Sequence, residues 1–135
     1  MRGIVCLVIL TMVASVTGVG DGLGQPIQEA PGDTVGYASV AAALQALRAR
    51  PDVVISEQHG WIVADDRANN TLWSFTPKGH PAFPAAVKRE IVQKKEGIFI
   101  DMSVRCEASK QACDNLVVEF QKLNDAAREH FRRSN

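Results

Sequence analysis

The chain has 135 residues, of which 46% are hydrophobic, and it carries 15 basic and 15 acidic side chains. This composition is typical of a single globular domain and excludes a chain kept disordered by its net charge. Because the charges balance, the sequence gives no general electrostatic reason to bind nucleic acid or an anionic membrane. We therefore expect no nucleic-acid partner.

Residues 1–20 differ in composition from the rest of the chain. Arg2 supplies one positive charge, residues 4–16 are almost wholly apolar, and small residues follow where a signal peptidase cuts. This pattern predicts a signal peptide over 1–20, and hence a periplasmic or secreted protein with no stable membrane insertion after cleavage. The alternatives are a membrane anchor, although a span requires about 20 apolar residues, and cleavage after Gly24 instead of Gly20.

The remaining chain predicts a short arm and one domain. Residues 21–35 are rich in Gly and Pro, as expected of a flexible arm, and the domain occupies 36–135. Its first element is a helix, with Ser39 as the favoured N-cap and Pro51 forcing the end. The apolar residues that recur at helical spacing are Tyr37, Val40, Leu44 and Leu47.

Three segments with strand character follow this helix. Residues 53–57 and 61–65 are rich in β-branched and aromatic side chains, but His59-Gly60 leaves open whether they are two strands or one bulged strand. Residues 66–70 have the composition of a hairpin loop. Residues 71–76 then form the next strand.

The pairing of this hairpin decides the position of its aromatic side chains. Placing Asp65 opposite Thr71 puts Trp61, Trp73 and Phe75 on one face, because side chains alternate along a strand. Large aromatics at this spacing are more often core. They can also stack on a sugar, a base or a peptide, so both interpretations stay open.

Proline residues make the connection over 77–84 stiff, and two further strands follow it. The strand over 86–94 and the turn after it carry a basic cluster of Lys88, Arg89, Lys94 and Lys95, which is either a solvated face and turn or part of a binding surface. Residues 98–106 alternate cleanly. Their apolar face consists of Ile98, Ile100, Met102, Val104 and Cys106.

A final helix begins after Ser109, its expected N-cap. Its apolar stripe consists of Cys113, Leu116, Val117, Phe120, Leu123, Ala127 and Phe131. The order of elements predicts an α+β fold, with an antiparallel sheet of three to five strands flanked by an N-terminal and a C-terminal helix on one face.

Cysteine usage fits an oxidising compartment. Cys6 leaves with the signal peptide, so Cys106 and Cys113 remain and are expected to form a disulfide. A zinc site would need two further ligands, and the histidines show no matching spacing. We expect no metal and no cofactor.

Motifs of catalysis are missing from the sequence. His80 is a candidate general base, but no nucleophile or carboxylate is spaced to work with it. A metal site of His59, His80 and Asp101 is an alternative without a recognisable motif. No catalytic residue is therefore assigned.

Several short motifs occur together between Tyr37 and Phe120. They are Trp73-Ser74-Phe75-Thr76-Pro77, His80-Pro81-Ala82-Phe83-Pro84-Ala85, Val87-Lys88-Arg89, and Cys106-Glu107-Ala108-Ser109-Lys110 followed by Cys113-Asp114. In combination these motifs resemble a family of small exported proteins of Gram-negative bacteria that has no established activity. The resemblance implies export and a disulfide-bonded domain, and it brings no catalytic residue.

We interpret the protein as a binding or interaction domain of the cell envelope or exterior, whose partner is a protein or another envelope component. A stiff proline loop loses little entropy when a partner orders it. The residues expected to bind are His80, Pro81, Phe83, Lys88, Arg89 and Trp73. The alternatives are a small hydrolase or metal-dependent enzyme using His80, and a small-ligand carrier with an aromatic-lined pocket.

Overall fold

The computed structural model describes residues 35–134. Its elements are α1 (Val40–Arg48), β1 (Val54–Gln58), β2 (Trp61–Asp66), the short 3-10 helix η2 (Arg67–Asn69), β3 (Thr71–Phe75), β4 (Ala85–Lys94), β5 (Gly97–Cys106) and α2 (Lys110–Arg133). The expected signal peptide and all but the last residue of the expected arm lie outside the described residues.

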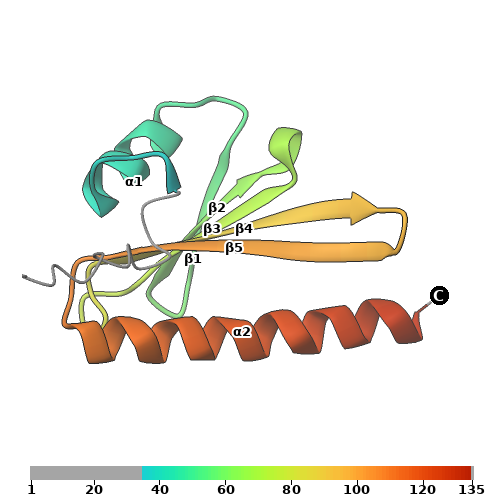
Figure 1. Ribbon diagram of the computed structural model, residues 1–135. Coiled ribbons are helices and arrows are strands. Elements are labelled where there is room, and N and C mark those ends of the chain that lie inside the picture. Colours follow the sequence, from blue (N-terminus) through green and yellow to red (C-terminus); the bar gives the residue numbers. More distant parts are fainter. Residues whose placement is uncertain (1–34, 135) are drawn as a thin grey trace, which may run out of the picture.

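The five strands form one antiparallel sheet in the order β1-β2-β3-β4-β5, so each strand pairs with its neighbour in sequence. With one helix before the sheet and one after it, the predicted α+β class is confirmed (Figure 1). β1 and β2 are separate strands, which settles the question that the sequence left open. The turn between them places His59 and Gly60 at φ values of 51° and 82°.

The two helices cover opposite faces of the sheet, whereas the sequence placed both on one face (Figure 1). α1 packs on a cluster that includes Trp73, Phe75 and Ala86. α2 packs on a second cluster that includes Ala85 and Val87. Since adjacent residues of a strand point to opposite faces, each face of β4 contributes to a different core. Hydrophobic periodicity cannot distinguish the two arrangements, because β4 is apolar on both faces at this end.

The register of the β2–β3 hairpin is one residue away from the prediction. Asp66 is opposite Thr71 and Ala64 is opposite Trp73. A slip of one residue moves a whole strand face to the other side of the sheet. Trp61 therefore lies on the α2 side, while Trp73 and Phe75 lie on the α1 side. The prediction of a single aromatic face was wrong, because Asp66 belongs to strand β2 rather than to the hairpin loop.

Both predicted helix starts are confirmed by their caps. The Oγ atoms of Ser39 and Ser109 accept hydrogen bonds from the backbone N–H groups of Ala42 and Ala112, at 3.0 and 3.3 Å. Such bonds satisfy N–H groups that have no partner within the helix. No helix among residues 35–134 is both long and apolar enough to span a membrane.

The predicted disulfide is present at the start of α2. Cys106 at the end of β5 is bonded to Cys113 in the first turn of the helix, with their Cα atoms 5.8 Å apart. The predicted apolar stripe holds only for the first half of α2. Leu116 and Phe120 are buried, but Leu123 and Phe131 are 50% and 42% exposed.

Candidate functional site

The residues expected to bind a partner do not form one surface. Trp73 and Lys88 lie on the α1 side of the sheet, while Arg89 lies on the α2 side next to Phe120. His80, Pro81 and Phe83 belong to the loop between β3 and β4. Lys88 and Arg89 are adjacent residues of β4, and adjacent residues of a strand point to opposite faces, so they cannot belong to one surface.

The proline loop is held at its base and within its turns. The Thr76 N–H donates to the Ala85 carbonyl at 3.0 Å, and the Ala85 N–H donates back to Thr76 Oγ1 at 2.9 Å. The N–H of His80 donates to Pro77 O, and that of Phe83 donates to His80 O, both at 2.9 Å. These bonds give the loop a defined shape, and Phe83, 41% exposed, lies near its β4 end.

Both ring nitrogens of His80 face groups of the protein. Nδ1 accepts the Ala82 N–H at 3.1 Å, and Nε2 lies 3.7 Å from Glu119 Oε2 on α2. The imidazole also packs edge-on against Trp61, with ring centroids 5.2 Å apart. A general base needs a free lone pair directed at a nucleophile. In this arrangement the Nδ1 lone pair of His80 accepts the Ala82 N–H. The geometry therefore favours a structural role for His80 in the β3–β4 loop over the role of a general base.

The three residues of the alternative metal site do not come together: the loops that carry His59 and His80 meet at one end of the sheet, whereas Asp101 lies toward the other end of β5. His59 lies in the β1–β2 turn, His80 in the β3–β4 loop, and Asp101 on β5, where it pairs with Glu90. Within residues 35–134 no group of three or more His, Cys, Asp or Glu side chains is arranged to hold a metal ion.

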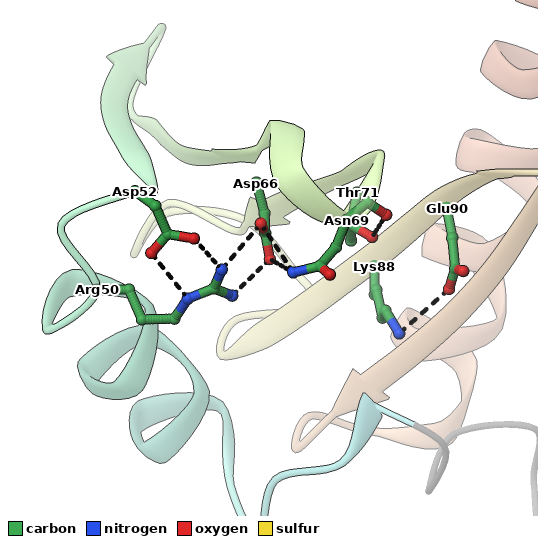
Figure 2. Close-up of polar contacts among 7 residues, drawn as sticks. All are labelled: Arg50, Asp52, Asp66, Asn69, Thr71, Lys88 and Glu90. Carbon is green, nitrogen blue, oxygen red and sulfur yellow. Dashed lines mark hydrogen bonds and ion pairs between the residues drawn. The ribbon is translucent and has the colours of Figure 1, made fainter.

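On the α1 side, a polar cluster joins the end of α1 to the β2–β3 hairpin (Figure 2). Arg50 donates to both oxygens of Asp66, at 2.5 and 3.0 Å, and Asn69 Nδ2 donates to the same oxygens at 3.0 and 3.1 Å. Arg50 also pairs with Asp52, at 2.5 Å. Asp66 is 3% exposed, so its charge is compensated where water does not reach it.

Electrostatics within this cluster follow from these contacts. Hydrogen bonds from Arg50 lower the pKa of Asp66, and those from Asn69 add to the effect, while burial opposes it. Hydrogen bonds to Asp52 and Asp66 raise the pKa of Arg50. Each charge has a partner inside the cluster. The arrangement is therefore a structural clamp, and the sequence offered no signal for it beyond the residue types.

Beside the clamp, a shallow depression of about 480 Å³ lies over Trp73 and Lys88. Trp73 is 4% exposed and packs against Tyr37 and Phe75, with ring centroids 5.8 and 6.3 Å away. The Lys88 amino group lies 3.5 Å from Glu90 Oε2, as Figure 2 shows. Trp73 is thus a core residue, and the charge of Lys88 is neutralised by its neighbour on the strand.

On the other side of the sheet, α2 lies along β5 and β4 (Figure 1). An open groove of about 770 Å³ lies between α2 and the same face of β1–β3. We call this the Arg89 groove. It is lined by Val54, Ser56, Gln58, His59, Trp61, Val63, Asp65, Arg67, Leu72, Ser74, Arg89, Glu119, Phe120 and Leu123.

Arg89 is the cation in the wall of this groove. Its guanidinium carbon lies 5.2 Å from the centroid of the Phe120 ring, a favourable cation–π distance. Its Nε is buried without a hydrogen-bond partner, and no ion pair joins Arg89 to a carboxylate among residues 35–134. Burial lowers the pKa of Arg89. The groove therefore combines apolar side chains with polar ones, which include the carboxylates of Asp65 and Glu119, and with a guanidinium that has no ion-pair partner among residues 35–134.

Two residues predicted from the sequence border the groove, and several others were missed. Arg89 lines it, and His80 packs on Trp61 at one end of it. Phe120 and Leu123 were assigned to a helix stripe expected to be core, and for Trp61 the sequence left a core and a stacking interpretation open. Pairing Asp66 rather than Asp65 with Thr71 would have placed Trp61 and Trp73 on opposite faces of the sheet. Comparisons with family models, curated proteins and solved structures found no match to this chain.

Proposed function

We propose that this chain is an exported binding domain that recognises a segment of an envelope or extracellular protein through the Arg89 groove. The observation that carries the proposal is the state of Arg89, half-buried against Phe120 with an unpaired Nε. Partial burial of a cation that has no ionic partner costs free energy. A ligand that brings an anionic group to Arg89 recovers that cost on binding.

The surroundings of Arg89 add an apolar contribution. Val54 and Leu123 are 56% and 50% exposed, and Trp61 is partly exposed at the same groove. Burying apolar surface contributes roughly 25 cal/mol per Å². A ligand with both apolar groups and a negative charge therefore suits this groove better than a purely polar one.

Two features support export. Residues 1–20 have the composition of a signal peptide, and the domain has a disulfide between Cys106 and Cys113. The resemblance to small exported proteins of Gram-negative bacteria agrees with both. N-terminal sequencing of the exported protein should give a chain that begins at Asp21. A chain that retains Met1 would contradict export.

The alternatives receive less support from the geometry. For a hydrolase, the lone pair of His80 Nδ1 is used by the Ala82 N–H. For a carrier with an aromatic-lined pocket, Trp73 belongs to the core and the groove beside Trp61 is open rather than enclosed.

The binding surface can be tested by placing a photo-reactive side chain at Leu123. Val118 is the matched control, because it lies on the same helix and is 48% exposed but does not line the groove. After irradiation of exported protein in cells, we expect a protein adduct from position 123 and none from position 118. Equal adducts at both positions, or adducts at neither, would refute binding in the groove.

A further inference from the structure

We propose that two copies of this chain pair along the outer edge of β5, so that their sheets form one continuous antiparallel sheet about a two-fold axis at Ser103. This edge is separate from the Arg89 groove, which no residue of β5 lines, and the proposal does not rest on the function proposed for that groove. It follows from the open edge of β5, from the direction of its backbone groups and from the positions of two charges.

β5 is an edge strand that lacks the usual protection against pairing. It is last in the strand order, so no strand among residues 35–134 pairs with its outer side. It is 10 residues long, and its register with β4 runs from Gly97 to Cys106 without a bulge. Edge strands are commonly short or bulged, or they carry Lys or Pro, and β5 contains neither residue. The opposite edge strand, β1, has only 5 residues. β5 is therefore the edge of this sheet that is suited to receive another strand.

The direction of the backbone groups decides which residues can pair. The Ile91 N–H donates to Asn70 O beside β3, so the odd-numbered residues of β4 bond toward β3 and the even-numbered residues bond toward β5. Glu90 is opposite Asp101, so the odd-numbered residues of β5 bond to β4. The N–H and C=O groups that point outward from β5 belong to Ile98, Ile100, Met102 and Val104. When two copies pair, even-numbered residues must therefore lie opposite even-numbered residues.

The charges of β5 complement those of a second copy in one such register. With the two-fold axis at Ser103, Asp101 of each copy lies opposite Arg105 of the other. Opposite charges in directly opposite positions stabilise an antiparallel pair, whereas like charges destabilise it. Asp101 is exposed and forms no ion pair within residues 35–134. An axis at Asp101 would place two aspartates opposite each other, and an axis at Met102 would place Arg105 opposite Phe99. The self-complementary charges are the reason to name a second copy rather than another protein.

The same two-fold axis places the two α2 helices side by side on one face of the continuous sheet. α2 packs on Val87 of β4 and on Val104 of β5. Adjacent strands are about 4.8 Å apart, so helices centred over the two β4–β5 pairs would have axes about 10 Å apart. Packed helices have axes about 8–10 Å apart. Pairing through β5 therefore extends the helix layer as well as the sheet.

A cysteine at the axis tests the register directly. The two copies of residue 103 would form a non-hydrogen-bonded pair with Cα atoms about 4.5 Å apart, which a disulfide can span. Under mild oxidation, purified Ser103→Cys protein should give a disulfide-linked dimer on a non-reducing gel. Asp101→Cys is the matched control, because it is on the same strand face and more exposed, but its two copies would be about 13 Å apart. Equal linkage at both positions, or none at position 103, would refute the pairing.

The wild-type protein provides a test that does not depend on the folding of a cysteine variant. Sedimentation equilibrium of the purified mature chain should show a dimer. Hydrogen exchange at the N–H groups of Ile100, Met102 and Val104 should slow as the protein concentration rises, because these groups become bonded to the second copy. If the edge is covered instead by residues before 35 or by another protein, the purified chain stays monomeric and this exchange is independent of concentration. Either result would refute the second copy as the occupant.

A charge reversal tests the contact between Asp101 and Arg105. Asp101→Arg should raise the dissociation constant of the dimer about tenfold or more, because it places like charges opposite each other twice in the interface. Glu57→Arg is the matched control, since it makes the same change of charge on β1 at the other edge of the sheet and should leave the dissociation constant unchanged. An unchanged dissociation constant for Asp101→Arg, or an equal increase for Glu57→Arg, would refute the pairing centred at Ser103.

Discussion

Asp66 is a buried charged side chain and Arg89 a half-buried one, and the fold surrounds them differently. Arg50 and Asn69 supply four hydrogen bonds to the Asp66 carboxylate. Arg89 has an aromatic ring beside it and an Nε without a partner in residues 35–134. Compensated burial is typical of structural charges, whereas uncompensated burial is more common where a ligand arrives.

The first prediction concerns the clamp and its pH dependence. Asp66→Asn should lower the free energy of unfolding at neutral pH more than Asp65→Asn, whose partner Arg67 is 82% exposed. The pKa of Asp66 is lowered in the folded protein from its ordinary value of 3.8, so the carboxylate stabilises the fold above that pH. This stabilisation is lost as the pH falls through the folded pKa.

Urea unfolding of both variants and the wild type between pH 7 and pH 3 checks this prediction. The difference between wild type and Asp66→Asn should shrink as the pH drops below about 4. A difference that grows on acidification, or an equal effect of Asp65→Asn at neutral pH, would contradict the clamp.

Among the elements, α2 changes character along its length. Its first half is joined to β5 by the disulfide and packs with Leu116 and Phe120 on the sheet. Further along, Asn124 is buried beside Met102, with its Oδ1 lacking a hydrogen-bond partner in the described part of the chain. Leu123 and Phe131 are exposed. Most of the packing energy of α2 therefore comes from its first half.

The second prediction compares two leucines on this helix. Leu116 is 1% exposed, so Leu116→Ala should lower the free energy of unfolding by about 2–5 kcal/mol. Leu123 is 50% exposed, and Leu123→Ala should cost less than about 1 kcal/mol. Chemical denaturation of the two variants measures both values. Similar losses would show that α2 does not bury Leu116 against the sheet while leaving Leu123 in solvent.

The third prediction concerns the disulfide between β5 and α2. It closes a short loop, with a sequence separation of 7 between its cysteines. In the chain-entropy treatment, closing such a loop stabilises the fold by about 2.5 kcal/mol. Adding a reductant should lower the unfolding free energy of the wild type by about this amount. The double variant Cys106→Ala, Cys113→Ala is the control and should not respond, whereas an unresponsive wild type would contradict the prediction.

At the scale of the whole molecule, Glu107 connects parts of the fold that lie on different faces of the sheet. It belongs to the short connection between β5 and α2, and its Oε1 accepts the N–H of Val40 at the start of α1, at 2.8 Å. Its own N–H donates to Pro84 O at 2.9 Å. One residue thus joins α1, the end of the proline loop and the start of α2.

The fourth prediction tests this connection. Glu107→Ala should lower the free energy of unfolding by about 1 kcal/mol, because it leaves an N–H of the first turn of α1 without its carboxylate partner. Glu96→Ala, in the exposed β4–β5 turn, is the control and should have little effect. Thermal unfolding followed by circular dichroism compares the two. Equal stabilities would mean that Glu107 does not hold α1.

Sequence alone determined the features that depend on residues close together in the chain. Hydrophobic spacing predicted both helices and the strands, Ser39 and Ser109 marked the helix starts, and the short separation of Cys106 and Cys113 suited a disulfide. Arg89 and His80 were also identified as binding candidates. Local propensities and side-chain periods are sufficient for these conclusions.

Only the tertiary structure decided the features that depend on distant residues. The β2–β3 register separated Trp61 from Trp73, the helices took opposite faces, and the Arg89 groove formed between α2 and one face of β1–β3. The pairing of Arg50 with Asp66 spans 16 positions, and that of Glu107 with Val40 spans 67. No local pattern encodes these contacts, because a shift of one residue in a strand preserves its composition while reversing every side chain.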